Sequence, residues 1–181
     1  MAALPVMFRR IVAVVEAMDW LLPTAARLVF AGVLLGYFWT SALTKLDGIF
    51  TLTTGAFAQI YPRALEAVGY DASQLGLLPH LVVLAGSWAE FVLPALIVLG
   101  LFTRLAALGM VGFVAMQSLT DIYGHMVEPA TVGAWFDRAS DALVLDQRAF
   151  WMLLFLVLIV KGAGPLSADR GLCRVFDRVA A

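Results

Sequence analysis

LVFAGVLLGYFWTSALT, residues 28–44, is the stretch of sequence that decides the fold, because it contains no charged residue. Arg27 and Lys45 lie directly before and after it, and Leu22 extends the apolar stretch backwards. A helix needs about 20 mostly apolar residues to cross the hydrocarbon core of a bilayer. We therefore expect residues 22–45 to form a first membrane-spanning helix.

Three further stretches have the same character. Residues 81–103, LVVLAGSWAEFVLPALIVLGLFT, contain Glu90 as their single charge, and residues 105–120, LAALGMVGFVAMQSLT, contain none. AFWMLLFLVLIV, residues 149–160, is short for a full crossing. It can span if its helix begins near Ser140 and Lys161 snorkels to the headgroups. The predicted second, third and fourth spans are 80–102, 104–123 and 142–162.

The N-terminal residues 5–20 are apolar but interrupted by Glu16 and Asp19, which does not fit the core of a cleavable signal peptide. They are better explained as an amphipathic helix lying at the membrane interface. No repeat or linker divides the chain. We therefore expect one membrane domain over 1–181, an all-α bundle of four transmembrane helices.

The composition agrees with a membrane protein. The chain has 181 residues, of which 62% are hydrophobic and 14% charged, whereas soluble domains average about 25% charged residues. Its first partner is therefore the lipid bilayer. A formal net charge of −1 gives no reason to expect a nucleic-acid partner. The single cysteine, Cys173, cannot form a disulfide within the chain.

The distribution of Lys and Arg predicts the orientation. With four spans and both termini in the cytoplasm, eight of the 12 basic residues fall on the cytoplasmic side. They are Arg9, Arg10, Arg27, Arg104, Lys161, Arg170, Arg174 and Arg178. Because cytoplasmic loops carry an excess of Lys and Arg, we expect an N-in, C-in protein.

Glu90 is the most informative residue because it lies near the middle of the second span. A charge at that depth costs about 2.5–3.5 kcal/mol on insertion scales, so it should face the bundle interior with a partner. Arg27 is the expected partner. Glu90 and Arg27 are thus candidate catalytic residues, with Glu90 as an acid or base toward a proton or a quinone oxygen. The alternative is a structural ion pair between the first two spans.

A pocket at this depth would have further lining residues. Ser87 and Pro94 share the helical face of Glu90 by their three- and four-residue spacing. Trp39 and Trp88 lie deep in their spans and could stack on a quinone ring, although packing in the core is the favoured explanation. Glu90, Ser87, Trp39 and Trp88 are therefore the candidate residues for binding a quinone cofactor.

A second polar cluster is predicted at the outer ends of the spans. His80 begins the second span, and Asp121 and His125 end the third. Two histidines and a carboxylate can ligate zinc, copper or iron, but their spacing matches no compact metal motif. The alternative is a polar rim at headgroup depth, held by an ion pair between Lys45 and Asp121.

Other residues suggest structural roles. Arg104 lies in the short turn between the second and third spans, and we expect it to pair with Asp169 and close the base of the bundle. Gly32 and Gly36 form a G-x-x-x-G motif, which allows close contact between helices. This contact can join two copies of the chain in a homo-oligomer, but packing within one bundle is favoured.

Three blocks of this sequence resemble the DoxX family. RLVFAGVLLGYFWTSALTKL, residues 27–46, is similar to the family's first helix, and AEFVLPALIVLGLFTRLAAL, residues 89–108, is similar to its acidic helix and the turn that follows. The matching positions in the second block are Glu90, Pro94, Gly100, Thr103 and Arg104. The third block, KGAGPLSADR at 161–170, resembles the motif after the last helix, with Gly162, Gly164 and Asp169 at its matching positions.

The resemblance implies a small four-helix protein of the bacterial inner membrane. The relative that gave the family its name is a subunit of a thiosulfate:quinone oxidoreductase, so the resemblance implies an accessory subunit of a quinone-linked redox system, working with a protein partner. Two alternatives stay open. One is a protein that handles a metal or small solute, and the other is a structural membrane partner without chemistry of its own.

Overall fold

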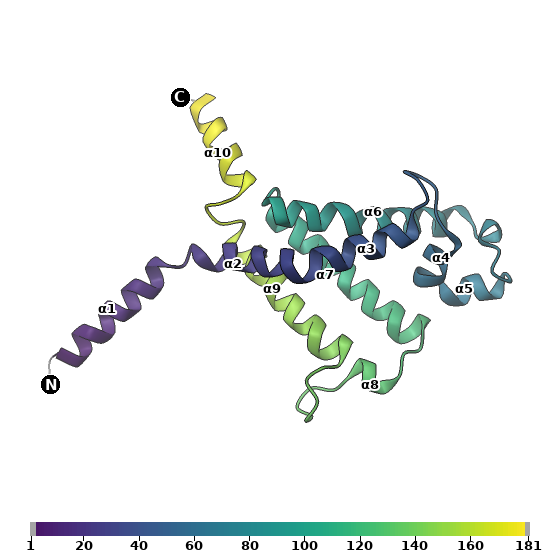
Figure 1. The fold of residues 1–181 in the computed structure, drawn as a ribbon, viewed down its shortest axis with the longest axis horizontal. Coiled ribbons are helices and arrows are strands. Elements are labelled where there is room, and N and C mark those ends of the chain that lie inside the picture. The colour runs from purple at the N-terminus through teal and green to yellow at the C-terminus, as the bar shows by residue number, and fades with distance from the viewer. Residues whose placement is uncertain (1–2, 180–181) are drawn as a thin grey trace.

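The computed structural model describes residues 3–179 and places four long apolar helices in one bundle (Figure 1). The first spans Leu21–Lys45 and consists of α2 (Leu21–Phe30), a π-helical segment (Ala31–Leu35) and α3 (Gly36–Lys45). The second is α6 (Leu77–Leu99). The third joins α7 (Thr103–Leu119) to a π-helical segment (Thr120–Gly124). The fourth joins the π-helical segment Leu143–Gln147 to α9 (Arg148–Lys161). Each is long and apolar enough to cross a membrane, so the all-α four-helix prediction is confirmed.

The turn between the second and third helices explains why α6 ends before the predicted boundary at 102. Gly100 has φ +70°, in the left-handed region, and Phe102 also has a positive φ of +48°. A left-handed residue after the last turn is a common helix terminator, and glycine adopts it without a Cβ penalty. The chain therefore reverses within three residues, from Leu99 to Thr103.

The helices enclose a core rich in aromatic residues. In the bundle α6 packs against α3 and α7, while α9 packs against α7 and α2. The fully buried core includes Phe30, Phe38, Met110 and Phe155. Phe30 and Phe155 join the first and fourth helices, with ring centroids 5.9 Å apart. Most other large apolar side chains on the four helices face outward, as they do where lipid is the solvent.

One end of the bundle, called the loop end here, carries the short helices α4 (Thr54–Ile60), α5 (Pro62–Ala67) and α8 (Pro129–Val132). Helices α4 and α5 lie beside the ends of α3 and α6 (Figure 1). They form a second, smaller core of Ala56, Phe57, Leu65 and Val83. The loop end is thus a folded cap rather than a set of open loops.

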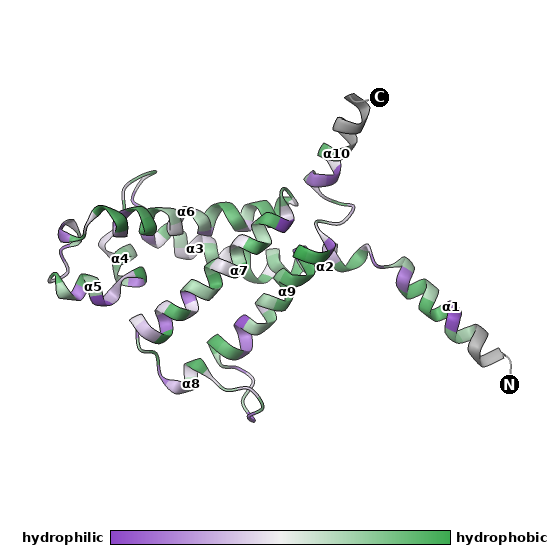
Figure 2. Ribbon diagram, turned by 180° about the vertical axis from the view of Figure 1, so that it is seen from behind, coloured by the Kyte–Doolittle hydropathy of each residue, from purple (hydrophilic) through white to green (hydrophobic). Residues whose placement is uncertain are grey.

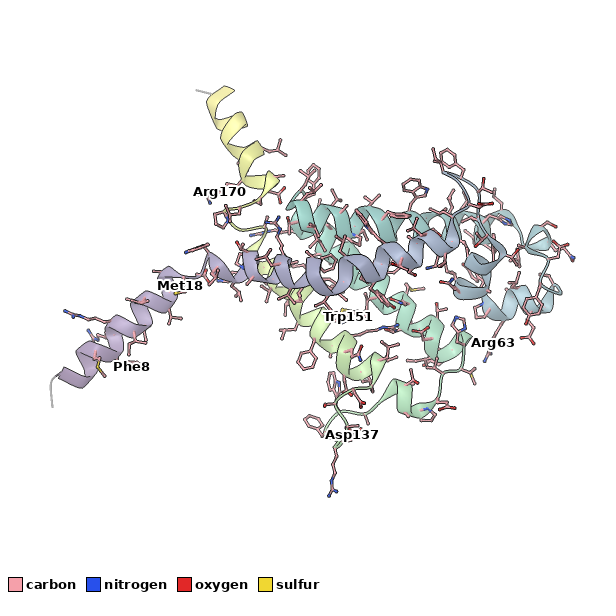
Figure 3. The ribbon with its side chains drawn as sticks, viewed as in Figure 1. Phe8, Met18, Arg63, Asp137, Trp151 and Arg170 are labelled. Carbon is pink, nitrogen blue, oxygen red and sulfur yellow. The ribbon has the colours of Figure 1, made fainter. Side chains whose placement is uncertain are left out.

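The opposite end, called the termini end, carries α1 (Ala3–Ala17) and α10 (Ala168–Val179), which project away from the bundle in different directions (Figure 1). Figure 2 shows that α1 is mostly apolar although no other element covers it. Phe8 and Met18 point into open space in Figure 3 and are 67% and 47% exposed. A separate N-terminal helix therefore exists close to the expected bounds of 5–20, and its place at the membrane interface stays a prediction.

Candidate functional site

Glu90 lies on the buried face of α6, together with Val83, Ser87, Pro94 and Ile97. The spacing of three and four residues puts these side chains on one side of the helix. Glu90 is only 4% exposed. The prediction that this carboxylate faces the bundle interior with a partner is correct.

The partner is Lys45, at the end of α3, and not Arg27 as expected. Lys45 Nζ donates to Glu90 Oε1 at 2.9 Å and to Oε2 at 2.8 Å, and the Lys45 side chain is as deeply buried as that of Glu90. It also donates to Ser41 Oγ, one helical turn earlier, at 2.6 Å. Side chains on a helix lean toward its N-terminus. A lysine that ends this span therefore points back into the membrane, where Glu90 lies.

The same rule explains why Arg27 does not reach Glu90. It lies in the first turns of the span, so its side chain leans toward the termini end. There the guanidinium donates to four backbone carbonyls, those of Ile97 (2.9 Å), Val98 (2.6 Å), Ala163 (3.0 Å) and Leu166 (2.5 Å). The last four carbonyls of a helix lack partners within the helix. Arg27 satisfies two of them at the end of α6 and ties α6 to the loop after α9.

The Lys45–Glu90 pair borders a cavity of about 580 Å³. It is lined from α3, α4, α6, α7 and the π-helical segment after α7. Small or apolar side chains make up much of the wall, including Ala85, Gly86, Ala89, Leu93, Gly109, Gly112, Phe113 and Met116. The polar lining residues are Ser41, Lys45, Gln59, Tyr61, Glu90, Gln117, Thr120, Asp121 and His125. A mostly apolar chamber with a few polar groups is the usual form of a small-molecule site.

Glu90 is the one predicted quinone-pocket residue that lines this cavity. Ser87 is fully buried, and its hydroxyl donates to the carbonyl of Val83 at 2.7 Å. The indole N–H groups of Trp39 and Trp88 donate to the carbonyls of Phe91 (3.2 Å) and Ile49 (2.9 Å). Both indoles lie against the ring of Phe91, outside the cavity. Stacking of a cavity-bound ring on Trp39 or Trp88 is therefore not supported.

Two residues of this site, Lys45 and Gln117, are not among the residues that the sequence predicts for it. The sequence predicts Lys45 in the outer polar rim, whereas the lean of helical side chains toward the N-terminus indicates that a lysine at the end of the first span points toward the membrane centre. Gln117 of α7 lines the cavity, and its Nε2 donates to the hydroxyl of Tyr37 at 2.9 Å. Gln117 is a single glutamine near the end of the third span, and it belongs to no motif by which the sequence could have identified it.

The predicted outer cluster does not assemble as a metal site. Among the residues that the structure describes, no three His, Cys, Asp or Glu side chains could hold a metal ion. His80 Nδ1 is bonded to the carbonyl of Gly76 at 3.1 Å, and its ring packs on Phe57. His125 Nε2 instead donates to the carbonyl of Gln59 at 3.0 Å.

Asp121 has a different partner from the one expected. It accepts from Arg148 at 2.6 Å, so the predicted pair between Lys45 and Asp121 is wrong. Arg148 also donates to Ser118 Oγ at 2.9 Å. The two contacts join α7 to α9 at the loop end, because Arg148 begins α9 and leans toward the loop that precedes it.

The expected pair between Arg104 and Asp169 is also wrong, although both residues do close the termini end. Asp169 accepts from the backbone N–H groups of Phe102 (2.7 Å) and Thr103 (3.1 Å). This satisfies free donors at the start of α7, where a negative charge is favourable. Arg104 donates to the carbonyl of Val160 at 3.2 Å, near the end of α9.

Positive φ values and close packing explain why glycines occur around these contacts. Gly162 and Gly164 have φ values of +78° and +77°, which favour glycine. A Cβ on Gly164 would lie 2.9 Å from Thr24 Oγ1, and one on Gly100 would lie 2.7 Å from Arg27 Cζ. The packing within the bundle that is predicted for the G-x-x-x-G motif is not observed. A Cβ on Gly32 or Gly36 would meet no atom within 4 Å, so these glycines do not pack against the rest of the chain.

The fold and the cavity define a small multi-pass membrane protein whose helices enclose a polar pair beside an apolar chamber. The family model described as DoxX matches residues 22–120, more than half of the chain, which therefore belongs to the DoxX family. The match covers the second span and most of the first and third, and it includes both residues of the Lys45–Glu90 pair. No curated protein and no solved structure matches the chain.

Proposed function

We propose that this DoxX-family membrane protein is an accessory subunit of a quinone-linked redox system in the bacterial inner membrane. The observation that carries the proposal is the buried Lys45–Glu90 pair beside a mostly apolar cavity of about 580 Å³. A quinone has a flat ring with polar oxygens and an apolar tail, so it needs a few polar groups within an apolar wall. Cavities of this size are typical of sites for small organic molecules.

The residues present fit such a ligand. Reduction of a quinone to a quinol adds two electrons and two protons. A protein partner with its own redox cofactor would supply the electrons. A protonated Glu90 would give one of these protons to a ring oxygen, the aqueous phase would supply the other, and Lys45 would stabilise the Glu90 carboxylate after its proton has left. The apolar wall would exclude bulk water from the ring.

Cavity filling tests ligand binding without touching the polar pair. At both Gly112, which lines the cavity, and Gly32, which does not, a Cβ would meet no atom within 4 Å. Gly112→Leu adds a side chain to the cavity, whereas Gly32→Leu makes the same change on another helix and serves as the control. With decylubiquinone as the probe in lipid nanodiscs, we expect Gly112→Leu to weaken binding at least tenfold and Gly32→Leu to leave it unchanged. Equal binding by all three proteins would rule out the cavity as the quinone site.

The role of Glu90 needs a second experiment. In membranes containing the redox partner, Glu90→Gln should abolish partner-dependent quinone reduction while the protein remains folded. Normal reduction by this variant would show that Glu90 is not an acid or base. If Glu90→Gln only lowers the thermal stability, the pair is structural, and the protein is a non-catalytic membrane partner.

A further inference from the structure

The cavity beside the Lys45–Glu90 pair is a wedge between α6 and α7. The two helices meet at its inner end, where a Cβ on Gly109 of α7 would lie 3.0 Å from Leu93 Cδ2 of α6. From there they diverge toward the loop end (Figure 1), and both line the cavity along this part of their length. The wall behind the wedge carries the buried side chains of Lys45 and Glu90. The other sides of the wedge decide from where a ligand enters.

The loop end of the wedge is covered by α4 and by the residue that begins α5. Helix α4 packs against α6. His125, just after α7 and its π-helical extension, donates from Nε2 to the carbonyl of Gln59 in α4 at 3.0 Å. A Cβ on the neighbouring Gly124 would lie 3.1 Å from Cγ of Pro62, which begins α5. The cap therefore contacts both helices that form the wedge, and it separates the cavity from the aqueous phase at this end.

The side of the wedge between α6 and α7 is open. Ala85 of α6 and Gly112 and Met116 of α7 line the cavity and are exposed. A Cβ on Gly112 would meet no atom within 4 Å. Ala85 and Met116 each lie eight residues, or about 12 Å, from the loop-end limit of their membrane spans. The surroundings at that depth are acyl chains, so this side of the cavity opens onto lipid.

The lining is polar toward the loop end and apolar toward the bilayer centre. Lys45 ends α3, and Gln117 and Thr120 lie near the end of the third span, whereas Leu93 and Gly109 lie at the inner end of the wedge. A cavity of about 580 Å³ encloses a drug-sized molecule, that is, a ring and a short piece of chain. A ligand with a longer apolar chain fits only if the chain leaves through the open side.

We propose that the cavity takes its ligand sideways from the loop-end leaflet of the bilayer, through the opening between Ala85 and Met116, and that this ligand is a quinone with a long isoprenoid tail. This inference rests on the proposed function, and it adds the route of entry and the class of quinone. The ring lies under α4 beside the Lys45–Glu90 pair, and the tail passes through the opening into the lipid. Because the tail has the same surroundings in the bound and the free state, its length changes the binding constant little.

The experiment compares two ligands that share one ring, ubiquinone with its full isoprenoid tail and the same ring without a tail. Displacement of the tritiated tail-less ring from protein in nanodiscs measures both, with each amount expressed as a mole fraction of the lipid and empty nanodiscs subtracted. Ala85→Trp narrows the opening. Val92→Trp is the matched control, because Val92 lies seven residues further along the same face of α6, is also exposed, and does not line the cavity.

We expect the wild type and Val92→Trp to bind both ligands with similar affinity. Ala85→Trp should weaken binding of the tailed ubiquinone at least tenfold and leave binding of the tail-less ring nearly unchanged. The inference is overturned if the tailed ubiquinone does not displace the tail-less ring from the wild type, since the ligand would then enter from the aqueous phase. It is also overturned if Ala85→Trp weakens both ligands equally or neither of them. In these cases the cavity remains a quinone site, whereas the proposed function itself fails if neither ligand binds the wild type.

Discussion

The Lys45–Glu90 pair allows a quantitative test of how the two helices α3 and α6 are held together. Both side chains are about 95% buried, and the ion pair is 2.8 Å long. Removing one partner of a buried pair leaves an uncompensated charge and typically costs about 3–5 kcal/mol. We therefore expect Lys45→Gln and Glu90→Gln each to destabilise the protein by about this amount.

The double variant distinguishes a coupled pair from two independent polar residues. When both charges are removed together, no unpaired ion remains, so the loss should be smaller than the sum of the single losses, with a coupling energy of about 1–3 kcal/mol. For a chain of this length, each single variant should lower Tm by about 10 °C. The double variant is also a control for function, because it lacks the Glu90 carboxylate but leaves no unpaired charge buried in the bundle.

Thermal unfolding in detergent micelles, followed by circular dichroism, measures these differences, and titration with a denaturing detergent gives an independent estimate. The reasoning would be refuted if the losses of the two single variants simply added in the double variant. Additivity would mean that Lys45 and Glu90 do not interact in the folded protein, whatever each contributes alone.

Three further predictions concern the termini end and the orientation. Arg27→Lys can keep at most three of the four carbonyl bonds, so we expect a loss of about 1.5–3 kcal/mol in thermal unfolding, and an unchanged Tm would contradict the assigned contacts. Asp169→Ala removes the acceptor at the start of α7 and should cost about 0.5–2 kcal/mol, whereas Asp169→Asn, which keeps one acceptor oxygen, should cost less; equal losses would refute the capping role. The exposed Cys173 should react with a membrane-impermeant maleimide in inverted vesicles but not in intact spheroplasts, and a Phe136→Cys variant lacking Cys173 should show the reverse. The opposite labelling pattern would overturn the N-in, C-in orientation.

Much of the fold could be predicted because a bilayer makes a simple demand on the sequence. Each span must be apolar over about 20 residues, and helices satisfy their own backbone hydrogen bonds in lipid. The weak fourth stretch became a full span, since a π-helical segment from Leu143 to Gln147 extends α9 at its start. The predicted end of the second span at 102 was late, because left-handed backbone at Gly100 ends α6 at Leu99.

The polar contacts were harder to predict. Several basic residues lie near span ends, namely Arg27, Lys45, Arg104 and Arg148. Hydropathy alone gives no reason to choose one of them as the partner of Glu90. The predicted partner Arg27 has a side chain that leans away from the membrane centre, toward the termini end. Arg27 and Asp169 bind backbone carbonyls and N–H groups that are free only at the ends of helices. The pattern of residue types does not specify where those helices end.

The sequence by itself determined that the chain lies in a lipid bilayer, how many times it crosses, and that Glu90 is the carboxylate in the middle of a span. These features depend only on the length of each apolar stretch and on the cost of a buried charge. Tertiary structure alone decided that Lys45 pairs with Glu90, that Arg27 and Asp169 bind backbone, and that Gln117 faces the same cavity. Lys45 and Glu90 are 45 residues apart and meet only because α3 packs against α6. Such partners are selected by distance and direction in space, which the order of residues along the chain does not contain.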